Sequence, residues 1–280
     1  MIAALLQNIE TGISDTFGTL NHRHEDLGTL RGDLSSWVPR WHLPWDSRWN
    51  AASTRGDFRA CGSKRLVWLK TTGPDNIVLM VKGLRVCRIK HVERVWLVKM
   101  PNSALGVVHD PDTVATRLGH ISSAITLHDG SLTGLPQTLV AGDLRSAAGQ
   151  SSSPTEVEAS FRALLTRLIY GVTSAGDEDA AALEVREARA LRYHNAMQVA
   201  CGNRRFFISD DGRIGLGPRV MRVGDLVAIF WGFKRPVVLR PSTKGQYRLC
   251  DEAYIHDLMD GRWTDAQVDA GIKDEVFSLY

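Results

Sequence analysis

Few features of this sequence indicate catalysis, metal binding or membrane insertion. Its four cysteines, Cys61, Cys87, Cys201 and Cys250, are widely separated and never form a CxxC pair, so a zinc ribbon or a thioredoxin-like site has no support. No run approaches the roughly 18–20 apolar residues that a membrane helix needs. The N-terminus also lacks the basic region and cleavage pattern of a secretory signal. We therefore expect a soluble, cytoplasmic protein with reduced thiols and no cofactor.

A concentrated basic stripe is also missing. The formal net charge is +3, from 34 Lys and Arg against 31 Asp and Glu, and the two signs are interleaved along the chain. Nucleic-acid-binding proteins usually cluster their basic residues. The densest basic stretch here, residues 85–94 (RVCRIKHVER), alternates charged with apolar residues like a half-buried strand. We therefore expect neither nucleic acid nor a membrane as a partner.

The apolar residues fall into strand-like and helix-like patterns. Short, strand-like runs occupy residues 65–70, 77–81, 84–89 and 95–100, and again 206–208, 226–231, 237–239, 247–249 and 253–255. Helical patterns lie between these groups, over 111–126, 154–171 and 180–200. The order strands, helices, strands predicts an α+β fold. We expect antiparallel strands in a small curled sheet or barrel, with a helical insertion.

Turn and cap signals set the expected ends of these elements. Lys82-Gly83 predicts a turn between two strands, and Gly215-Leu216-Gly217-Pro218 predicts another. Thr155 followed by Glu158 resembles a capping box at a helix start, and Gly171 is placed to end that helix.

We divide the chain into three parts. They are an N-terminal helix and irregular segment (1–35), a composite α+β domain (36–262) and a C-terminal tail (263–280); within the composite domain, strands are expected over 64–100, helices over 154–200 and a barrel-like part over 203–258. A Trp-rich segment from Trp37 to Trp49 opens the composite domain, and its prolines break a helical pattern. We expect a packed, extended connector there, with an aromatic platform for a ligand as the alternative.

No complete catalytic motif is present. There is no GxSxG elbow, and no cysteine has a recognisable catalytic context. The glycine spacing of residues 212–217 suits phosphate binding only superficially, because Pro218 and a strand follow where a helix should begin. Residues 22–26 (HRHED) and 109–112 (HDPD) offer metal-ligating side chains without a third ligand at matching spacing, so we expect polar loops there. Cys250 and His256 are close in sequence, but Cys250 ends an apolar strand and is expected in the core. A hydrolase that uses His256 and a nearby acid is a further hypothesis.

A binding surface is a further hypothesis. Barrels of this size often bind ligands through aromatic residues and loops at one end. Arginine binds acidic groups through its forked donors, and two Arg-Pro pairs bracket one predicted strand. The candidate interaction surface comprises Trp231, Phe233, Arg235, Arg240 and His256. His256 equally suits a structural hydrogen bond at a strand end.

Three blocks of the sequence contain a distinctive series of motifs. They are SWVPRW at 36–41, ACGSK at 60–64 with LMVKGLRVCRI at 79–89, and a C-terminal run that contains RRFF (204–207), GRIGLGP (212–218), GD (224–225), RPVVLRP (235–241) and MDG (259–261). In order and spacing they resemble the region after the HET domain in fungal heterokaryon incompatibility proteins. The motif positions are Trp37, Pro39, Trp41, Arg205, Phe206, Gly215, Gly217, Pro218, Gly224, Asp225, Pro236, Arg240, Pro241, Met259 and Gly261. Arg40 and Cys87 stand where the family usually has Asp.

The resemblance implies a function that the residues alone do not. The HET domain is similar to TIR domains and is taken to be the effector that triggers cell death when unlike strains fuse; its signature blocks occur nowhere in this sequence. The resemblance therefore implies a non-catalytic accessory or regulatory module in self/non-self recognition and programmed cell death. Its partner would be an effector domain in cis or in trans. The alternative is a stand-alone β-barrel binding module for a peptide, nucleic acid or small ligand.

Overall fold

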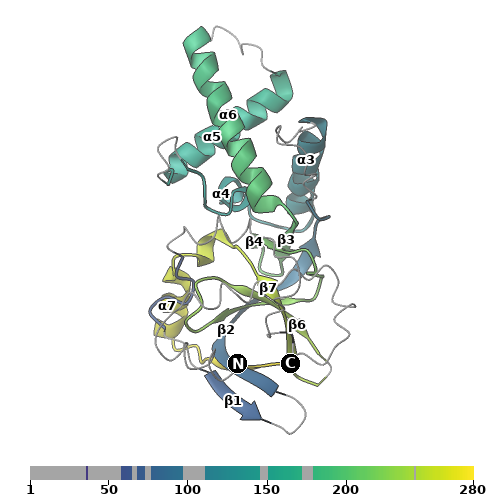
Figure 1. The fold of residues 1–280 in the computed structure, drawn as a ribbon, viewed down its shortest axis with the longest axis vertical. Helices are drawn as coiled ribbons and strands as arrows, with labels where there is room; N and C mark the ends of the chain where they lie inside the picture. Colours follow the sequence, from purple (N-terminus) through teal and green to yellow (C-terminus); the bar gives the residue numbers. More distant parts are fainter. Residues whose placement is uncertain are drawn as a thin grey trace.

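The computed structural model describes Ser36 and residues 58–64, 68–72, 77–96, 111–145, 151–171, 179–242 and 244–280. These residues form a strand-built end and a helical end, which Figure 1 shows at the bottom and the top of the molecule. The helix expected within 1–35, the Trp-rich segment with Trp37, Pro39 and Trp41, and residues 22–26 and 109–110 lie outside the described residues.

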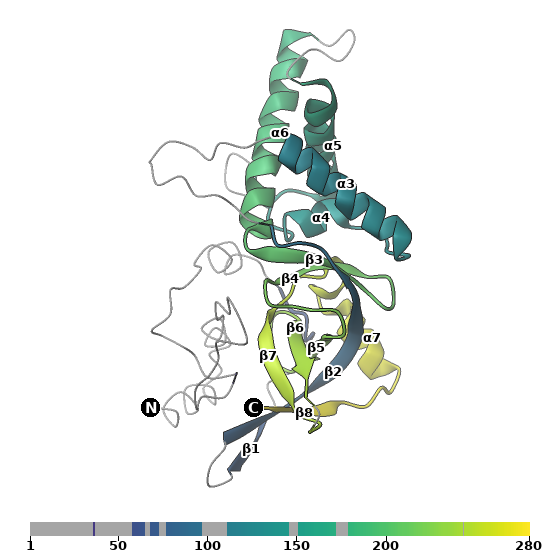
Figure 2. The same ribbon diagram turned by 90° about the vertical axis from the view of Figure 1, so that its right-hand side faces the viewer.

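Five of the described strands form a ring. The ring consists of β2 (Ile77–Val92), β5 (Leu226–Phe230), β6 (Val237–Pro241), β7 (Tyr247–Glu252) and β8 (Glu275–Leu279), and β2 pairs with both β5 and β8. Neighbours run antiparallel except β7 and β8, which meet in one parallel pair between Tyr247 and Leu279. Figure 2 shows the long β2 bending past the other ring strands. The predicted α+β fold with a small barrel is confirmed.

Side chains from all five ring strands fill the inside of this barrel. The cluster comprises Leu79, Val81, Leu226, Ala228, Phe230, Phe233, Val237, Leu239, Leu249, Phe277 and Leu279. The Phe230 ring packs against Phe233 and Phe277 with centroid distances of 5.3 and 5.4 Å. Because successive strand side chains point to opposite faces, Val227 and Ile229 of β5 point outward, into a second cluster.

A layer of short segments covers this outward face. The layer consists of residues 58–64, η2 (His256–Leu258) and α7 (Arg262–Asp269). The backbone N–H of Arg59 donates to the carbonyl of Met259 at 2.8 Å, and the Thr264 hydroxyl donates to the carbonyl of Ala60 at 2.5 Å. Gly261 has φ +84°, and a Cβ there would lie 2.5 Å from the carbonyl oxygen of Arg59. Glycine is therefore needed where the two segments touch, and β5 is buried along its whole length.

The C-terminal residues complete the barrel. Residues 263–280, which we expected to form a tail, contain most of α7 and all of β8. Phe277 and Leu279 are buried in the barrel, whereas the side chain of the neighbouring residue Val276 is 42 % exposed. This alternation is that of a half-buried strand, and it gives the C-terminus a structural role.

β2 is a single strand of 16 residues. The turn predicted at Lys82-Gly83 is therefore wrong. A Cβ at Gly83 would overlap the carbonyl oxygen of Ile229 in β5, so the glycine allows a close approach of two strands rather than a reversal of the chain. The start of β2 pairs with β1 (Trp68–Thr72) and its end pairs with β3 (Arg204–Ser209).

The glycines of residues 212–217 belong to a hairpin. β3 pairs with β4 (Ile214–Pro218), and the turn lies before β4, at Gly212 with φ +80°. The turn predicted over residues 215–218 is wrong, because those residues are strand. A Cβ at Gly215 would lie 2.6 Å from both the Phe207 ring and the carbonyl oxygen of Tyr254. No helix begins in these residues, so they lack the helix N-terminus of a phosphate site.

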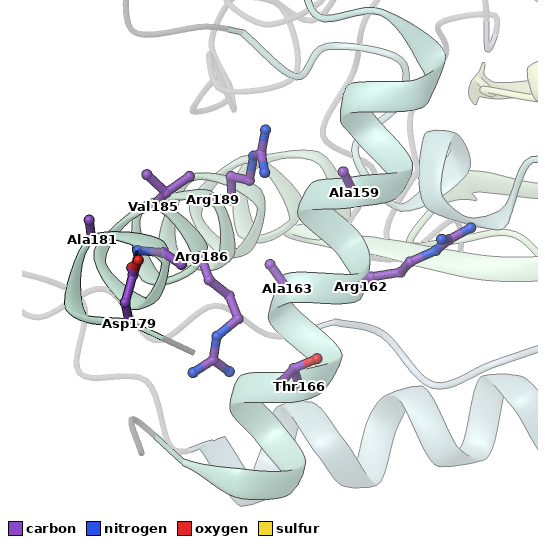
Figure 3. A pocket seen from close by; sticks show the side chains of 10 residues that line it. Ala159, Arg162, Ala163, Thr166, Asp179, Ala181, Val185, Arg186 and Arg189 are labelled. Atoms are coloured by element: carbon purple, nitrogen blue, oxygen red, sulfur yellow. Dashed lines mark hydrogen bonds between the residues drawn. The ribbon is translucent and has the colours of Figure 1, made fainter. Parts of the chain in front are cut away.

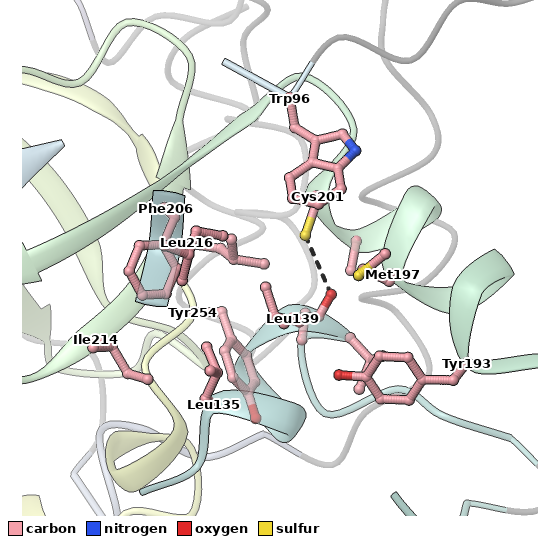
Figure 4. Packing of buried hydrophobic residues seen from close by; sticks show 14 of the residues in the cluster. Trp96, Leu135, Leu139, Tyr193, Met197, Cys201, Phe206, Ile214, Leu216 and Tyr254 are labelled. Carbon is pink, nitrogen blue, oxygen red and sulfur yellow. Dashed lines mark hydrogen bonds between the residues drawn. The ribbon is translucent and has the colours of Figure 1, made fainter. Parts of the chain in front are cut away.

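The helices inserted between the strand groups pack on the β3–β4 hairpin. They are α3 (Pro111–Leu127), α4 (Leu135–Leu139), α5 (Pro154–Tyr170) and α6 (Ala180–Cys201). Figure 4 shows their shared core, in which the Cys201 thiol donates to the carbonyl of Leu139 at 3.3 Å. The Tyr193 hydroxyl donates to the carbonyl of Pro136 at 2.6 Å. None of the helices that the structure describes has the length and apolar character required to cross a membrane.

The ends of α5 and α6 agree with the predicted positions, but one cap differs. Ser153, not Thr155, caps α5, and its hydroxyl accepts the backbone N–H of Glu156 at 3.2 Å. Pro154 favours this arrangement, because proline suits the first helical position and its missing N–H is unneeded there. Gly171 ends α5 as predicted, and Asp179 caps α6 by accepting the N–H of Ala182 at 2.7 Å.

Candidate interaction surface

The aromatic residues of the predicted interaction surface lie in the interior. Trp231 is 5 % exposed, and its indole N–H donates to the Asp274 carboxylate at 3.4 Å. Phe233 is 6 % exposed and packs edge-on against Phe230. Both side chains therefore stabilise the barrel in this structure and do not line an exposed groove.

The polar residues of that set are also engaged inside the fold. Arg235 is 6 % exposed, donates to the Glu252 carboxylate at 2.5 Å and lies 5.3 Å over the Phe58 ring. His256 is half-buried, with Nδ1 3.1 Å from the Tyr254 hydroxyl. His256 begins the 3-10 helix η2 and does not end a strand, and this contact gives its ring a partner inside the fold. The predicted residues do not form one exposed face.

The cysteines are protected from reaction. Cys250 is 1 % exposed, and burial raises the pKa of its thiol to about 12; burial raises the pKa of Cys87 to about 12 as well. A thiol with such a pKa stays protonated, and thus poorly nucleophilic, near neutral pH. Among the described residues no group of three or more His, Cys, Asp or Glu side chains is arranged to hold a metal ion. The hydrolase hypothesis gains no support from Cys250.

Several motif positions instead meet at one loop, residues 219–224, which joins β4 to β5. We call it the braced loop. Asp225, 2 % exposed, follows it and accepts hydrogen bonds from Nε and Nη2 of Arg240 at 2.9 and 2.8 Å. Asp225 also accepts the N–H of Arg222 at 2.8 Å, and Arg240 donates to the carbonyl of Val220 at 2.7 Å. Burial disfavours the charged guanidinium, but the hydrogen bonds and charge of Asp225 outweigh it and raise the pKa of Arg240.

Two further arginines donate to the same loop from other strands. Arg205 of β3 donates to the carbonyls of Met221 at 2.9 Å and Glu93 at 2.8 Å. Arg88 of β2 donates to the carbonyl of Gly224 at 2.8 Å. Charge-assisted hydrogen bonds of this kind contribute about 1.5–3 kcal/mol each. Arginines from β2, β3 and β6 therefore hold the backbone of one loop.

The glycines and a buried methionine fix the shape of the loop. Met221 is fully buried, and a Cβ at Gly217 would lie 2.5 Å from its sulfur. The Met221 N–H donates to the carbonyl of Pro218 at 3.0 Å, which closes a turn. Gly224 has φ +88°, a conformation that favours glycine, and its N–H donates to the carbonyl of Ile89 at 2.9 Å. The motif Gly-Leu-Gly-Pro followed by Gly-Asp thus specifies this loop.

The outer side of the loop is basic with one apolar residue. Arg88, Arg219 and Arg222 are exposed, and Val223 is 64 % exposed. Among the described residues, no hydrogen bond or ion pair occupies the guanidinium groups of Arg219 and Arg222. Burial lowers the pKa of Arg205. The negative charge of Glu93 opposes this effect, and the nearby positive charge of Arg222 adds to it. The positive charge at the loop is therefore concentrated and only partly neutralised.

Sequence reasoning missed Arg88, Arg219, Arg222 and Val223. Arg219 and Arg222 lie in the PRVMRVGD stretch, between two turn signals, where exposed side chains are expected. Their position between turn signals could therefore have identified them as exposed. Arg88 had no such signal, because it belongs to β2 and reaches the loop only through tertiary pairing.

The remaining described motif positions have structural roles. Phe206 is buried under the helices, and Met259 is buried beside residues 58–64. The carbonyl of Pro236 accepts the N–H of Ala253 at 2.9 Å, and Pro241 ends β6. These four residues shape the fold, and none of them has a reactive side chain.

A second surface feature lies between α5 and α6. It is an open hollow of about 630 Å³, floored by small side chains such as Ala159 and Ala163 and edged by Arg162, Arg186 and Arg189. Figure 3 shows these side chains around the space where the two helices diverge. Arg162 pairs with Glu158 at 3.4 Å and Arg189 pairs with Glu156 at 3.3 Å. Acidic side chains of α5 therefore neutralise much of the positive charge at the edge of the hollow.

Part of the chain is similar to known proteins. Residues 170–271 match the family model of the Het-6 β-barrel domain. A stretch of 65 residues is 38 % identical to "Heterokaryon incompatibility protein 6, OR allele" of Neurospora crassa, and the match covers 22 % of this chain and 10 % of that protein. No solved structure matches the chain. The resemblance to the C-terminal region of fungal heterokaryon incompatibility proteins is confirmed for this part of the chain.

The matched residues include the braced loop but not the whole ring. They span α6, the strands from β3 to β7, η2 and α7. β2 and β8, which complete the ring, lie outside residues 170–271. The barrel of this chain is therefore built from the matched region together with one strand from each side of it.

Proposed function

We propose that this chain is a non-catalytic accessory or regulatory module in fungal heterokaryon incompatibility, and that it acts by contact with a protein partner. The main observation in favour of this proposal is that the motif residues have a structural role. Arg205, Gly217, Asp225 and Arg240 hold one exposed loop in a fixed shape and do not surround a reactive group. A module that works by recognition benefits from such a preformed surface, because less conformational freedom is lost on binding.

The proposed role in heterokaryon incompatibility is based on the sequence similarity of residues 170–271. The printed name of the Neurospora protein assigns that protein to heterokaryon incompatibility. The match spans about a tenth of that protein's length, so a role in programmed cell death and self/non-self recognition is proposed for the chain and not transferred to it. Under the proposal the cytoplasmic partner is an effector domain in cis or in trans, and the chain alters its activity without producing a toxic product itself.

The test is a cell-death assay in Neurospora crassa. The full chain is expressed in a compatible strain pair and in a pair that undergoes the incompatibility reaction, and dead cells in the fusion zone are counted with a vital dye. We expect no death in the compatible pair and a changed death rate in the incompatible pair. An unchanged rate at confirmed expression would refute the regulatory role.

A biochemical control separates regulation from catalysis. The purified chain is incubated with nicotinamide dinucleotide, the substrate class that a TIR-like effector would consume, and the products are separated by chromatography. We expect no turnover above the buffer blank. Robust turnover by pure protein would mean that the chain is an effector and not an accessory module.

A ligand groove inside the barrel is the weaker alternative. The inner side chains of all five ring strands form one packed cluster around Phe230 and Phe277. Small barrels whose interior is filled in this way use the packing for stability. The exposed loop is the better candidate for contact with a partner.

A further inference from the structure

The braced loop combines a fixed backbone with exposed positive charge and an exposed apolar side chain. Three arginines from three strands donate to its carbonyls, at Val220, Met221 and Gly224. Its own Arg219, Arg222 and Val223 point away from the fold, as their exposure shows. Such a surface loses little backbone entropy on binding a ligand, because the backbone is already ordered.

The acids near the loop neutralise only part of its charge. The Asp225 carboxylate is paired with Arg240 through two hydrogen bonds. Asp210 accepts the backbone N–H of Arg88 at 2.9 Å, and the negative charge of Glu93 acts on Arg205. No hydrogen bond or ion pair among the described residues joins an acid to the guanidinium groups of Arg219 and Arg222. The exposed arginines at positions 88, 219 and 222 therefore keep an excess of positive charge, which attracts a negatively charged partner.

We propose that the braced loop binds an acidic segment of a partner protein, through carboxylates to Arg219 and Arg222 and an apolar contact with Val223. Guanidinium groups match carboxylates with paired hydrogen bonds. The inference deepens the proposed function and rests on it, because it names the partner chemistry of a module that acts by contact.

Other anionic partners fit the loop less well. A membrane-binding element needs a substantial apolar face beside its basic residues, and Val223 is one side chain. A nucleic acid needs a basic stripe that follows the backbone, and the charges here occupy one loop and the strand end beside it. A short, extended acidic segment matches the size of the surface, and a contact this small is expected to be weak and transient.

The test measures binding of a labelled acidic peptide to the full chain. The probe is a fluorescent peptide of roughly a dozen Asp, Glu, Ser and Leu residues, and the paired probe has every Asp and Glu replaced by Asn and Gln. Binding is followed by fluorescence anisotropy at low and at high salt. We expect binding of the acidic probe alone, with an affinity that falls as salt screens the charges.

Matched variants locate the binding site. Arg219→Ala with Arg222→Ala should weaken binding about tenfold or more, because mutation at a contact between complementary charges removes the attraction. Arg162→Ala with Arg262→Ala removes two exposed arginines elsewhere, on α5 and at the start of α7, and should change the affinity less than twofold. All four side chains are exposed, so both variants should unfold at the temperature of the unaltered chain.

Several outcomes would overturn the inference. They are absence of acidic-peptide binding, equal binding of the amide peptide, and equal losses in the two double variants. Tighter binding to phosphatidylserine-containing vesicles or to single-stranded DNA than to the peptide would assign the loop to those partners instead. If the Arg219→Ala, Arg222→Ala chain still alters cell death like the unaltered chain, the regulatory role stands and the loop is not its contact.

Discussion

The Asp225 carboxylate accepts hydrogen bonds from two nitrogens of the Arg240 guanidinium, at 2.9 and 2.8 Å, and it is 2 % exposed. Both residues belong to the family-like motif, and they directly flank the Leu226–Leu239 pair at the end of the β5–β6 ladder. The same carboxylate orders Arg222, and the same guanidinium holds Val220. One ion pair therefore connects the barrel to the shape of its exposed loop.

Removal of Arg240 should destabilise the protein strongly. Arg240→Ala leaves the Asp225 carboxylate buried without its partner, which costs about 3–5 kcal/mol. The measurement is the free energy of unfolding from urea denaturation of the variant and the unaltered chain. Arg262→Ala is the matched control: it breaks an ion pair with Asp260 whose arginine is 90 % exposed, and such pairs contribute less than about 1 kcal/mol. Equal losses in both variants would contradict a buried role for the Asp225–Arg240 pair.

Closure of the barrel by β8 can be tested at two adjacent residues. Phe277→Ala deletes a fully buried ring that packs against Phe230 at 5.4 Å, and such deletions cost about 3–5 kcal/mol. Val276→Ala changes the neighbouring side chain, which is 42 % exposed, and should cost below about 1 kcal/mol. Thermal and urea unfolding measure both. A small loss for Phe277→Ala would show that β8 does not complete the core in solution.

The sequence predicted the fold where the signal was local. Strand-length apolar runs and helical periodicity are visible in single segments, so β5, β6, α5 and α6 were placed close to their observed bounds. Glycine was misleading at Gly83 and at Gly215. Local patterns read these glycines as turns, whereas each one allows another strand or an aromatic ring to approach closely. Such contacts depend on tertiary packing and leave no local signature.

The candidate site was less predictable than the fold. Arg240 and Asp225 were recognised as motif positions, but their sequence gives no indication that they bind each other. Trp231 and Arg235 suggested a binding surface because aromatic and basic residues are common at interfaces. Burial decided otherwise, since both side chains are covered by the fold. The exposure of a residue depends on which segments cover it, and residues 58–64 come from far away in the chain.

Alanine substitutions at two glycines should change the free energy of unfolding in opposite directions. Gly215→Ala places a Cβ 2.6 Å from the backbone oxygen of Tyr254, so β4 must shift and we expect a loss of about 1–3 kcal/mol. Gly119 lies within α3, and a Cβ there meets nothing within 4 Å. Gly119→Ala should stabilise the protein by about 0.5–1 kcal/mol, because alanine favours the helix. Urea denaturation measures both, and equal signs would contradict the close packing at Gly215.

A buried carboxyl group should make stability depend on pH. Burial raises the pKa of Asp251 to about 7, and the nearby Glu252 adds to this effect, although the positive charge of Arg204 acts in the opposite direction. Asp251 lies 3.7 Å from the Arg204 guanidinium, and its side chain accepts the N–H of Glu252 at 2.7 Å. The ionised form is therefore disfavoured in the folded state relative to the unfolded chain, where the pKa is ordinary.

Between pH values of roughly 4 and 7 the folded state should hold a proton at Asp251 that the unfolded chain releases. The free energy of unfolding should consequently fall as the pH rises through this range, by at most ~1.4 kcal/mol per pH unit, and level off above it. Asp251→Asn cannot ionise, so its stability relative to the unaltered chain should rise over the same range. Urea denaturation at several pH values measures the difference. Asp260→Asn serves as the control. Burial acts to raise the pKa of Asp260, but the hydrogen bonds and charge of Arg262 outweigh burial and lower the pKa. That variant should differ from the unaltered chain above a pH of about 4 and converge with it below. Parallel curves for Asp251→Asn and the unaltered chain would show that Asp251 is ionised in the fold.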